Sequence, residues 1–327
     1  MMVRPRLPIS LKNFAISMPC RLFCAPLSLI LLLASTAICA AAEAQPQMET
    51  IRLGKARLEL QFAPGFKAAA RAETRAWVQR SAQAVAGYFG RFPVERVTIL
   101  LVPQAGNGVD SGTTYNEPEL SIRVRVGRDT SRAVFLDDWV MVHEMMHLAI
   151  PDVPANQTWF HEGVATYAEI VARAQAGLVS NERVWSALYR NLQQGLPQAG
   201  DRGLDHTPTW GRTYWGGALF CFLADLEIRQ GTQNRLGLKD ALRGIVDAGG
   251  NYAETWPLRK TLNAADRAVG LTVLADMHAG MKATATLTDL GKLWRELGVG
   301  ERQGVIVFDD AAPKAALRRA LLAVRGN

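Results

Sequence analysis

The sequence predicts an α+β fold, in which a sheet with helices precedes a mainly helical part. Three short segments carry strand patterns: residues 51–62 alternate around Gly54, residues 97–102 (VTILLV) form a continuous apolar run, and residues 120–126 (LSIRVRV) alternate strictly. From residue 134 onward, apolar residues recur mainly at helical spacing. Strands followed by helices in this order are typical of an α+β domain.

The same patterns predict the individual elements. Residues 66–89 have helical spacing and precede a proline, whereas residues 103–119 are rich in turn-forming residues and are expected to be a loop. The alternation at 120–126 predicts a half-buried strand near a sheet edge. We expect further helices at 134–150, 159–176, 181–194 and 213–230, and a strand at 305–308.

Residues 1–44 have the organisation of a secretory signal peptide. A basic start precedes the apolar run 27–38 (LSLILLLASTAI), and small residues follow, ending in Ala42-Glu43-Ala44. We therefore expect an exported protein, periplasmic or secreted. The alternative is a membrane tether, because residues 23–42 are uncharged over a length that barely spans a bilayer.

Net charge and cysteine content bear on two questions: whether the protein binds nucleic acid, and whether disulfides stabilise it. Removing residues 1–44 takes away four basic residues and one acidic residue, so the formal net charge falls from +7 to +4. The remaining charge is too weak and scattered to predict a nucleic-acid partner. Of four cysteines only Cys221 lies beyond residue 44, so we expect no internal disulfide and a core large enough to fold without one.

Residues 143–147 read H-E-M-M-H within the predicted helix 134–150. Positions i and i+4 of a helix lie on one face, so His143 and His147 can bind the same ion. Zinc suits imidazole ligands and lowers the pKa of a bound water to near 7. Glu144 then lies beside the ion and can take a proton from that water. The motif therefore predicts a catalytic Zn²⁺ site.

A catalytic zinc requires a third protein ligand. The next helix begins W-F-H-E-G-V-A-T-Y-A-E at residues 159–169, after a loop that contains prolines and turns the chain back. Glu162 and His161 are both candidates for the third ligand. Neighbouring helix positions point about 100° apart, so only one of the two is expected to bind the metal.

These motifs resemble the gluzincin metallopeptidases, in the branch that holds the M1 and M61 aminopeptidases. That branch pairs H-E-x-x-H with a later helix of the type W-x-x-E-G-x-A-x-Y-x-E, which this chain matches at residues 159–169. The resemblance implies a thermolysin-like zincin domain with an N-terminal mixed sheet. It also implies Glu162 as the third zinc ligand, and Glu169 as an acid that orients a zinc-binding histidine.

Residues 213–220 (TYWGGALF) resemble the segment in which that branch places a tyrosine that stabilises the oxyanion. The resemblance implies this role for Tyr214, and His206 on the preceding loop is the alternative donor. The family usually has lysine where this chain has Gly216. The G-x-M-E-N segment that binds the substrate amino group in M1 enzymes is absent, so Glu117 and Glu119 are the candidates for that contact.

The sequence as a whole predicts a zinc-dependent peptidase that hydrolyses peptide bonds through a zinc-activated water, with Glu144 as general base. The expected partner is a peptide or protein substrate. We expect a catalytic domain at 45–230, with 231–327 as the helical C-terminal part of the same domain. Two alternatives remain: a catalytically inactive zincin-fold binding protein, and a hydrolase of a non-peptide amide in the cell envelope.

Overall fold

A computed structural model describes residues 47–323 of the chain, all within one compact unit. The predicted signal peptide lies outside these residues. Within the described part, no helix has the length and apolar character needed to span a bilayer. The division of the mature chain at residue 230 stays a prediction.

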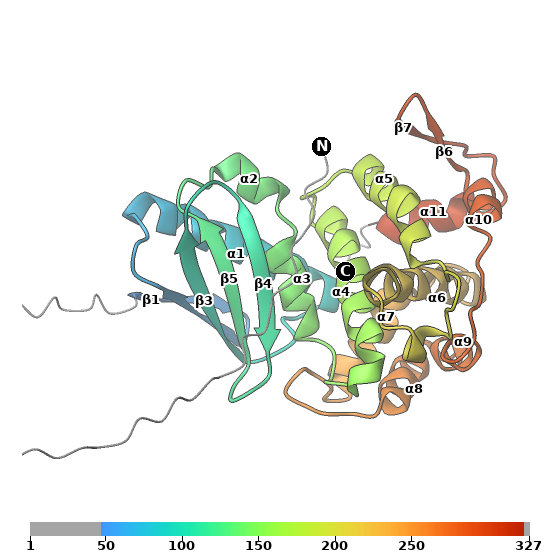
Figure 1. Cartoon of the computed structure of the whole chain (residues 1–327), viewed down its shortest axis with the longest axis horizontal. Helices are drawn as coiled ribbons and strands as arrows, with labels where there is room; N and C mark the ends of the chain where they lie inside the picture. Colours follow the sequence, from blue (N-terminus) through green and yellow to red (C-terminus); the bar gives the residue numbers. More distant parts are fainter. Residues whose placement is uncertain (1–46, 324–327) are drawn as a thin grey trace, which may run out of the picture. The chain divides into compact units, whose positions relative to one another are not determined.

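Five strands form a mixed sheet in the first half of the described chain (Figure 1). Its spatial order is β1-β2-β3-β5-β4, in which β2, β3 and β5 run parallel and the two outer pairs are antiparallel. The strands are β1 (Gln47–Leu53), β2 (Ala56–Phe62), β3 (Arg96–Gln104), β4 (Val109–Tyr115) and β5 (Ser121–Gly127). The α+β fold class predicted from the sequence is confirmed.

The loop predicted at residues 103–119 is wrong in part, because Val109–Tyr115 within it form strand β4. Polar and small residues dominate β4 (VDSGTTY) because it is an end strand of the sheet and most of its side chains are exposed or half-buried. Its register with β5 also shifts between Val109 and Ser111, which interrupts a regular alternation. Strand β5 is consequently not the edge: it lies between β3 and β4.

Helix α1 (Ala68–Phe89) makes the crossover that the parallel pairing of β2 and β3 requires. It ends at Gly90, whose φ of 79° is a left-handed conformation that glycine adopts without strain. Its apolar side packs on the sheet face that carries the fully buried Leu58, Ile99 and Ile122. This face and α1 form the first part of the core.

After the sheet the chain is mainly helical, and from α4 onward it lies on the far side of α3 from the sheet (Figure 1). A two-stranded hairpin, β6 (Val299–Arg302) and β7 (Val305–Phe308), is inserted near its end, and β7 matches the predicted strand. The helices are α2 (Arg132–Asp137), α3 (Val140–His147), α4 (Thr158–Gln175), α5 (Asn181–Asn191), α6 (Gly217–Gly231), α7 (Leu238–Asp247), α8 (Leu258–Val269), α9 (Val273–Met281), α10 (Leu290–Leu297) and α11 (Ala315–Leu322).

The single helix predicted at 134–150 is wrong, because the chain breaks between α2 and α3. Asp138 adopts an extended conformation (ψ 143°) that ends α2. Its carboxylate accepts hydrogen bonds from Trp77 Nε1 at 3.1 Å and from the Met141 backbone N–H at 3.4 Å. Asp138 therefore anchors the start of α3 to α1, which fixes where the H-E-M-M-H segment lies.

Candidate metal centre

Helix α3 carries two histidines that face the same side. His143 and His147 are one helical turn apart, and each is only 6% exposed. All eight residues of α3 are buried, so the helix is packed against other parts of the protein on every face. The helix ends at His147, shortly before Pro151, and the chain then returns as α4.

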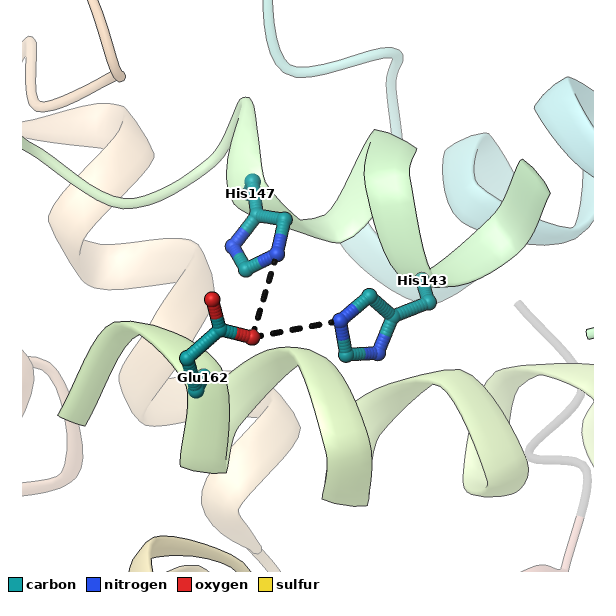
Figure 2. Close-up of side chains that lie close together, drawn as sticks. All are labelled: His143, His147 and Glu162. Carbon is teal, nitrogen blue, oxygen red and sulfur yellow. Dashed lines mark ion pairs between the residues drawn. The ribbon is translucent and has the colours of Figure 1, made fainter. Parts of the chain in front are cut away.

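Helix α4 brings Glu162 against this pair (Figure 2). Glu162 Oε2 lies 3.3 Å from His143 Nε2 and 3.6 Å from His147 Nε2. One potential ligand atom from each residue lies within 4.8 Å of the others. Four ligands held tetrahedrally at zinc distances of about 2.0–2.1 Å lie roughly 3.4 Å apart, so the three side chains fit one zinc ion.

A buried atom without a partner supports the same fit. Glu162 Oε2 is shielded from solvent and makes no hydrogen bond within the described part of the chain. A buried carboxylate oxygen in that state is costly unless it is paired with a proton donor or a metal. Two imidazole nitrogens and one carboxylate oxygen are also the donor set that zinc accepts in open, catalytic sites.

The two histidines have different electrostatic surroundings. Burial is the largest influence on the pKa of His143 and lowers it, but the carboxylates of Glu162 and Glu144 outweigh burial, so the net pKa is raised. The pKa of His147 is well below its usual value because of burial and the neighbouring His161 and His143 imidazoles. His147 is therefore a neutral imidazole, the form that binds metal.

Glu144 lies next to the triad formed by His143, His147 and Glu162, and a residue of the edge strand β4 contacts its carboxylate. Thr114 Oγ1 of β4 lies 2.6 Å from Glu144 Oε2. Burial raises the pKa of Glu144, while the charge of His143 and the hydrogen bond from Thr114 act in the opposite direction. A Cβ atom added to Gly112 would lie 2.4 Å from Glu144 Cγ, so glycine is needed for this close approach.

A cavity of about 230 Å³ opens over the triad. The β4 segment 112–114 forms one wall, and Tyr214 and Tyr252 complete the lining together with the triad, Glu144 and His161. Burial, with the nearby Glu162 and Glu144 charges, raises the pKa of Tyr214 to about 12. The Tyr214 hydroxyl thus keeps its proton at neutral pH and can donate a hydrogen bond into the cavity.

Tyr214 lies in a π-helical turn, Gly211–Gly216, that leads directly into α6. Such turns are rare and are frequent at functional sites. The buried ion pair between Arg212 Nε and Asp201 Oδ2, 2.8 Å apart, ties this turn to the preceding loop. The predicted helix 213–230 is thus present, with a first turn of different geometry.

A close helix crossing sets Tyr214 relative to Glu162. Gly163 follows Glu162 on α4, and Gly217 begins α6 after the π-helical turn. A Cβ atom on Gly163 would lie 2.3 Å from the Gly217 backbone, and one on Gly217 would lie 2.1 Å from the Trp159 carbonyl oxygen. Only glycines allow the two backbones to approach this closely.

The other residues singled out in the sequence lie elsewhere or make different contacts. His206 is exposed and is not in the cavity lining, and neither are Glu117 and Glu119, which are exposed on the turn between β4 and β5. Glu169 is buried, but its carboxylate pairs with Arg173 at 3.4 Å, with no hydrogen bond to a histidine among the described contacts. Burial raises its pKa to about 7.

Four lining residues were not predicted from the sequence: Gly112, Thr113 and Thr114 of β4, and Tyr252. Thr114 lies in the segment that the sequence predicted to be a loop. Its place in the cavity follows from the pairing of β4 with β5, which the local sequence pattern does not show. Tyr252 follows α7, more than 100 positions after His147, and its ring lies 4.6 Å from that of His161. No local pattern marks Tyr252, because only tertiary packing brings it to the cavity.

No protein-family model matches this sequence, and no curated protein matches it. Solved structures do resemble it. An aminopeptidase N family protein from Idiomarina loihiensis matches with a TM-score of 0.56 and 16% identity, over 77% of this chain and 49% of that one. The M1 zinc metallopeptidase from Deinococcus radiodurans matches with a TM-score of 0.48 and 18% identity, over 75% and 54%.

This chain thus spans about half the length of those two proteins. At such low identity the likeness is one of fold, and the Idiomarina structure carries it. The chain therefore has an α+β fold similar to that of an aminopeptidase N family protein, and this fold holds a candidate His143-His147-Glu162 metal site.

Proposed function

We propose that this protein is a zinc-dependent peptidase. The observation that carries the proposal is the convergence of Glu162 Oε2 on the Nε2 atoms of His143 and His147, in a cavity that Glu144 and Tyr214 also line. The triad would hold Zn²⁺, which when bound lowers the pKa of water and polarises a substrate carbonyl.

The surrounding residues supply the proton transfers. Glu144 accepts the proton of the attacking water and returns it to the leaving amine. Thr114 holds one oxygen of the Glu144 carboxylate at 2.6 Å, which leaves the other free for this exchange. The protonated Tyr214 hydroxyl donates a hydrogen bond to the carbonyl oxygen as negative charge develops there.

Strand β4 offers a way to align a peptide. It is an end strand of the sheet, and its residues 112–114 line the cavity. An extended peptide can add to such an edge through main-chain hydrogen bonds, which would lay its scissile bond along the wall that faces Glu144. We infer a peptide or protein substrate on this basis.

We further propose that the protein is exported, in the periplasm or secreted, on the evidence of the basic start, apolar run and small-residue cleavage site in residues 1–44. Sequencing the N-terminus of the protein from cell fractions tests this. A mature chain that starts near Gln45 outside the cytoplasm is expected, and a full-length chain in the cytoplasm would contradict it.

The decisive test of activity compares the purified, zinc-loaded protein with its Glu144→Gln variant on a complex peptide mixture read by mass spectrometry. Cleavage by the parent alone is expected, with stoichiometric zinc in both. Cleavage by both proteins would refute the role of Glu144. If both bind zinc and neither cleaves peptides, the peptidase proposal fails in favour of a binding protein or a hydrolase of another amide.

A further inference from the structure

His161 contacts a proposed metal ligand directly. Its Nδ1 lies 2.7 Å from His147 Nδ1, and its Nε2 lies 3.3 Å from the carbonyl oxygen of Ile150. The His161 and His147 rings are within 6° of parallel, with centroids 4.6 Å apart. The nitrogens are thus much closer than the ring centres, so the rings are offset and share an N–H···N hydrogen bond rather than stack face to face.

The carbonyl of Ile150 decides the direction of this hydrogen bond. A carbonyl oxygen can only accept, so His161 Nε2 must carry the proton. A neutral His161 then has a lone pair on Nδ1, and the proton between the two rings belongs to His147 Nδ1. In this arrangement His147 Nε2 is left with its lone pair, and that nitrogen is the one 3.6 Å from Glu162 Oε2.

The reverse assignment fails at both ends. If His161 Nδ1 donated its proton to His147, His161 Nε2 would place a lone pair against the lone pairs of the Ile150 oxygen. His147 would then carry its proton on Nε2 and could not bind a metal beside Glu162. Only the first assignment satisfies both hydrogen bonds of His161 and leaves a metal-binding nitrogen of His147 beside Glu162.

His161 is itself held in place. The Tyr252 ring, tilted by 40°, lies 4.6 Å from it on the side of the cavity, and the residue is only 7% exposed at the start of α4. Because Glu162 is the next residue on the same helix, one helical turn supplies both a metal ligand and the group that orients another ligand. His143, by contrast, has no hydrogen-bond partner for Nδ1 within the described residues.

We propose that His161 is a positioning residue: it acts through its Nδ1 lone pair to hold His147 in the tautomer, and the ring orientation, that presents Nε2 to the metal. This inference rests on the proposed function, because it assumes that His147 is a ligand. The partner of a metal-bound histidine is usually a carboxylate, a carbonyl or water. Here a neutral imidazole fills that role and adds no charge to the site.

Two amide substitutions separate this role from simple packing. Asparagine places its Oδ1 where histidine has Nδ1, so His161→Asn keeps the acceptor for His147. Glutamine carries its amide one bond further, so His161→Gln keeps a donor near Ile150 but loses that acceptor. Zinc dissociation constants, measured by competition with a chromophoric chelator, should stay near the parent value for Asn and weaken about 10–100-fold for Gln.

A second readout needs neither activity nor metal. In the metal-free full-length protein, ¹⁵N NMR of the imidazole rings is expected to show His147 protonated on Nδ1, and His161 on Nε2. His147 protonated on Nε2 would overturn the inference, whether or not the variants fold. Circular dichroism identifies any variant that is unfolded, and the inference then rests on the NMR result for the parent.

The outcomes keep the two proposals apart. Equal zinc affinity for the parent and both variants would overturn the role of His161 and leave the proposed function intact. Absence of zinc binding by the parent would overturn the proposed function. The tautomer observed by NMR would still decide whether His161 orients His147.

Discussion

The Thr114 hydroxyl lies 2.6 Å from the Glu144 carboxylate and 2.9 Å from the carbonyl oxygen of the same residue. The second contact arises because α3 ends early: Leu148 N–H bonds to Met145 rather than to Glu144, so the Glu144 carbonyl is left for Thr114. One side chain of strand β4 therefore fixes both the backbone and the side chain of the proposed general base.

Replacing Thr114 with valine should impair catalysis without removing the metal. Valine has nearly the same shape but no hydroxyl, and a hydrogen bond to a charged group contributes about 1.5–3 kcal/mol, so kcat should fall roughly 10- to 100-fold. The pKa of Glu144 should rise because the hydrogen bond that lowers it is lost. The acidic limb of the kcat/KM profile should therefore move to higher pH.

Thr114→Ser is the matched control, because it keeps the hydroxyl and should retain most of the activity. Zinc content should be the same in all three proteins. Unchanged turnover and an unmoved acidic limb in Thr114→Val would show that β4 does not position Glu144.

A methyl group at Gly112 should displace Glu144 directly. The added Cβ would lie 2.4 Å from Glu144 Cγ and 2.8 Å from Oε1, closer than atoms can approach, so the carboxylate must move. A misplacement of about 1 Å in an active site costs on the order of a hundredfold in rate, which is the loss expected for Gly112→Ala.

Gly87→Ala provides the comparison for Gly112→Ala. Gly87 is exposed on α1, and a Cβ atom there would have nothing within 4 Å. This control should keep full activity and gain about 0.5–1 kcal/mol in stability, as alanine does in a helix. Full activity in Gly112→Ala as well would mean that the Glu144 side chain has room to relocate productively.

The features that the sequence predicted correctly are those whose patterns lie within a short stretch of the chain. His143 and His147 were recognised because the spacing of four is local to one helix. Pro151 and Pro154 marked the loop that brings Glu162 back. The fold class was predictable for the same reason, since strand and helix periodicities are read within short windows.

The wall opposite the helices was not predictable in this way. Strand β4 pairs with β5 across a turn, contains a register shift, and faces solvent on one side, so its apolar pattern is weak. Asp138 breaks a continuous helical pattern through one extended residue and two hydrogen bonds to distant groups. Tyr252 depends wholly on the packing of a later turn. Contacts between residues far apart in the chain produce no periodic pattern in the sequence, so these features could not be predicted from it.

The buried ion pair behind Tyr214 should be costly to break. The side chains of Arg212 and Asp201 are 3% and 1% exposed, so Asp201→Ala leaves a guanidinium buried without its partner. We therefore expect Asp201→Ala to lower the free energy of unfolding by about 3–5 kcal/mol, and chemical denaturation would measure this change. Turnover should fall as well, because the π-helical turn that carries Tyr214 loses its anchor.

The exposed pair Arg190–Glu301 is the control for this prediction. Its side chains are 49% and 32% exposed, so Glu301→Ala should cost at most about 1 kcal/mol. The double variant Asp201→Ala/Arg212→Met should recover part of the loss, because no charge remains buried. A cost for Asp201→Ala no greater than that for Glu301→Ala would refute the anchoring role.

Asp138 should give the stability of the protein a specific pH dependence. Burial raises its pKa from 3.8 to about 6, although hydrogen bonds from Met141, Val140 and Trp77 act against the shift. A carboxyl with a higher pKa in the folded state binds more protons when folded, so the free energy of unfolding falls as pH rises from about 4 to 6. A shift of roughly two units corresponds to about 3 kcal/mol.

Asp138→Asn removes this titration and keeps an oxygen that can accept one of the hydrogen bonds. The stability of the parent minus that of the variant, from urea unfolding with a chelator present, should therefore decrease between pH 4 and 6 and level off above pH 7. Subtracting the two curves cancels the groups that titrate in both proteins.

The adjacent Asp137 gives a control of opposite sign. Its pKa is lowered by a hydrogen bond from Arg183, so its contribution is present above pH 3.8 and is lost as pH falls. The same difference measured for Asp137→Asn should thus increase with pH in the acidic range. A stability difference between the parent and Asp138→Asn that does not change with pH would show that the pKa of Asp138 is the same in the folded and unfolded states, so that its hydrogen bonds cancel the effect of burial.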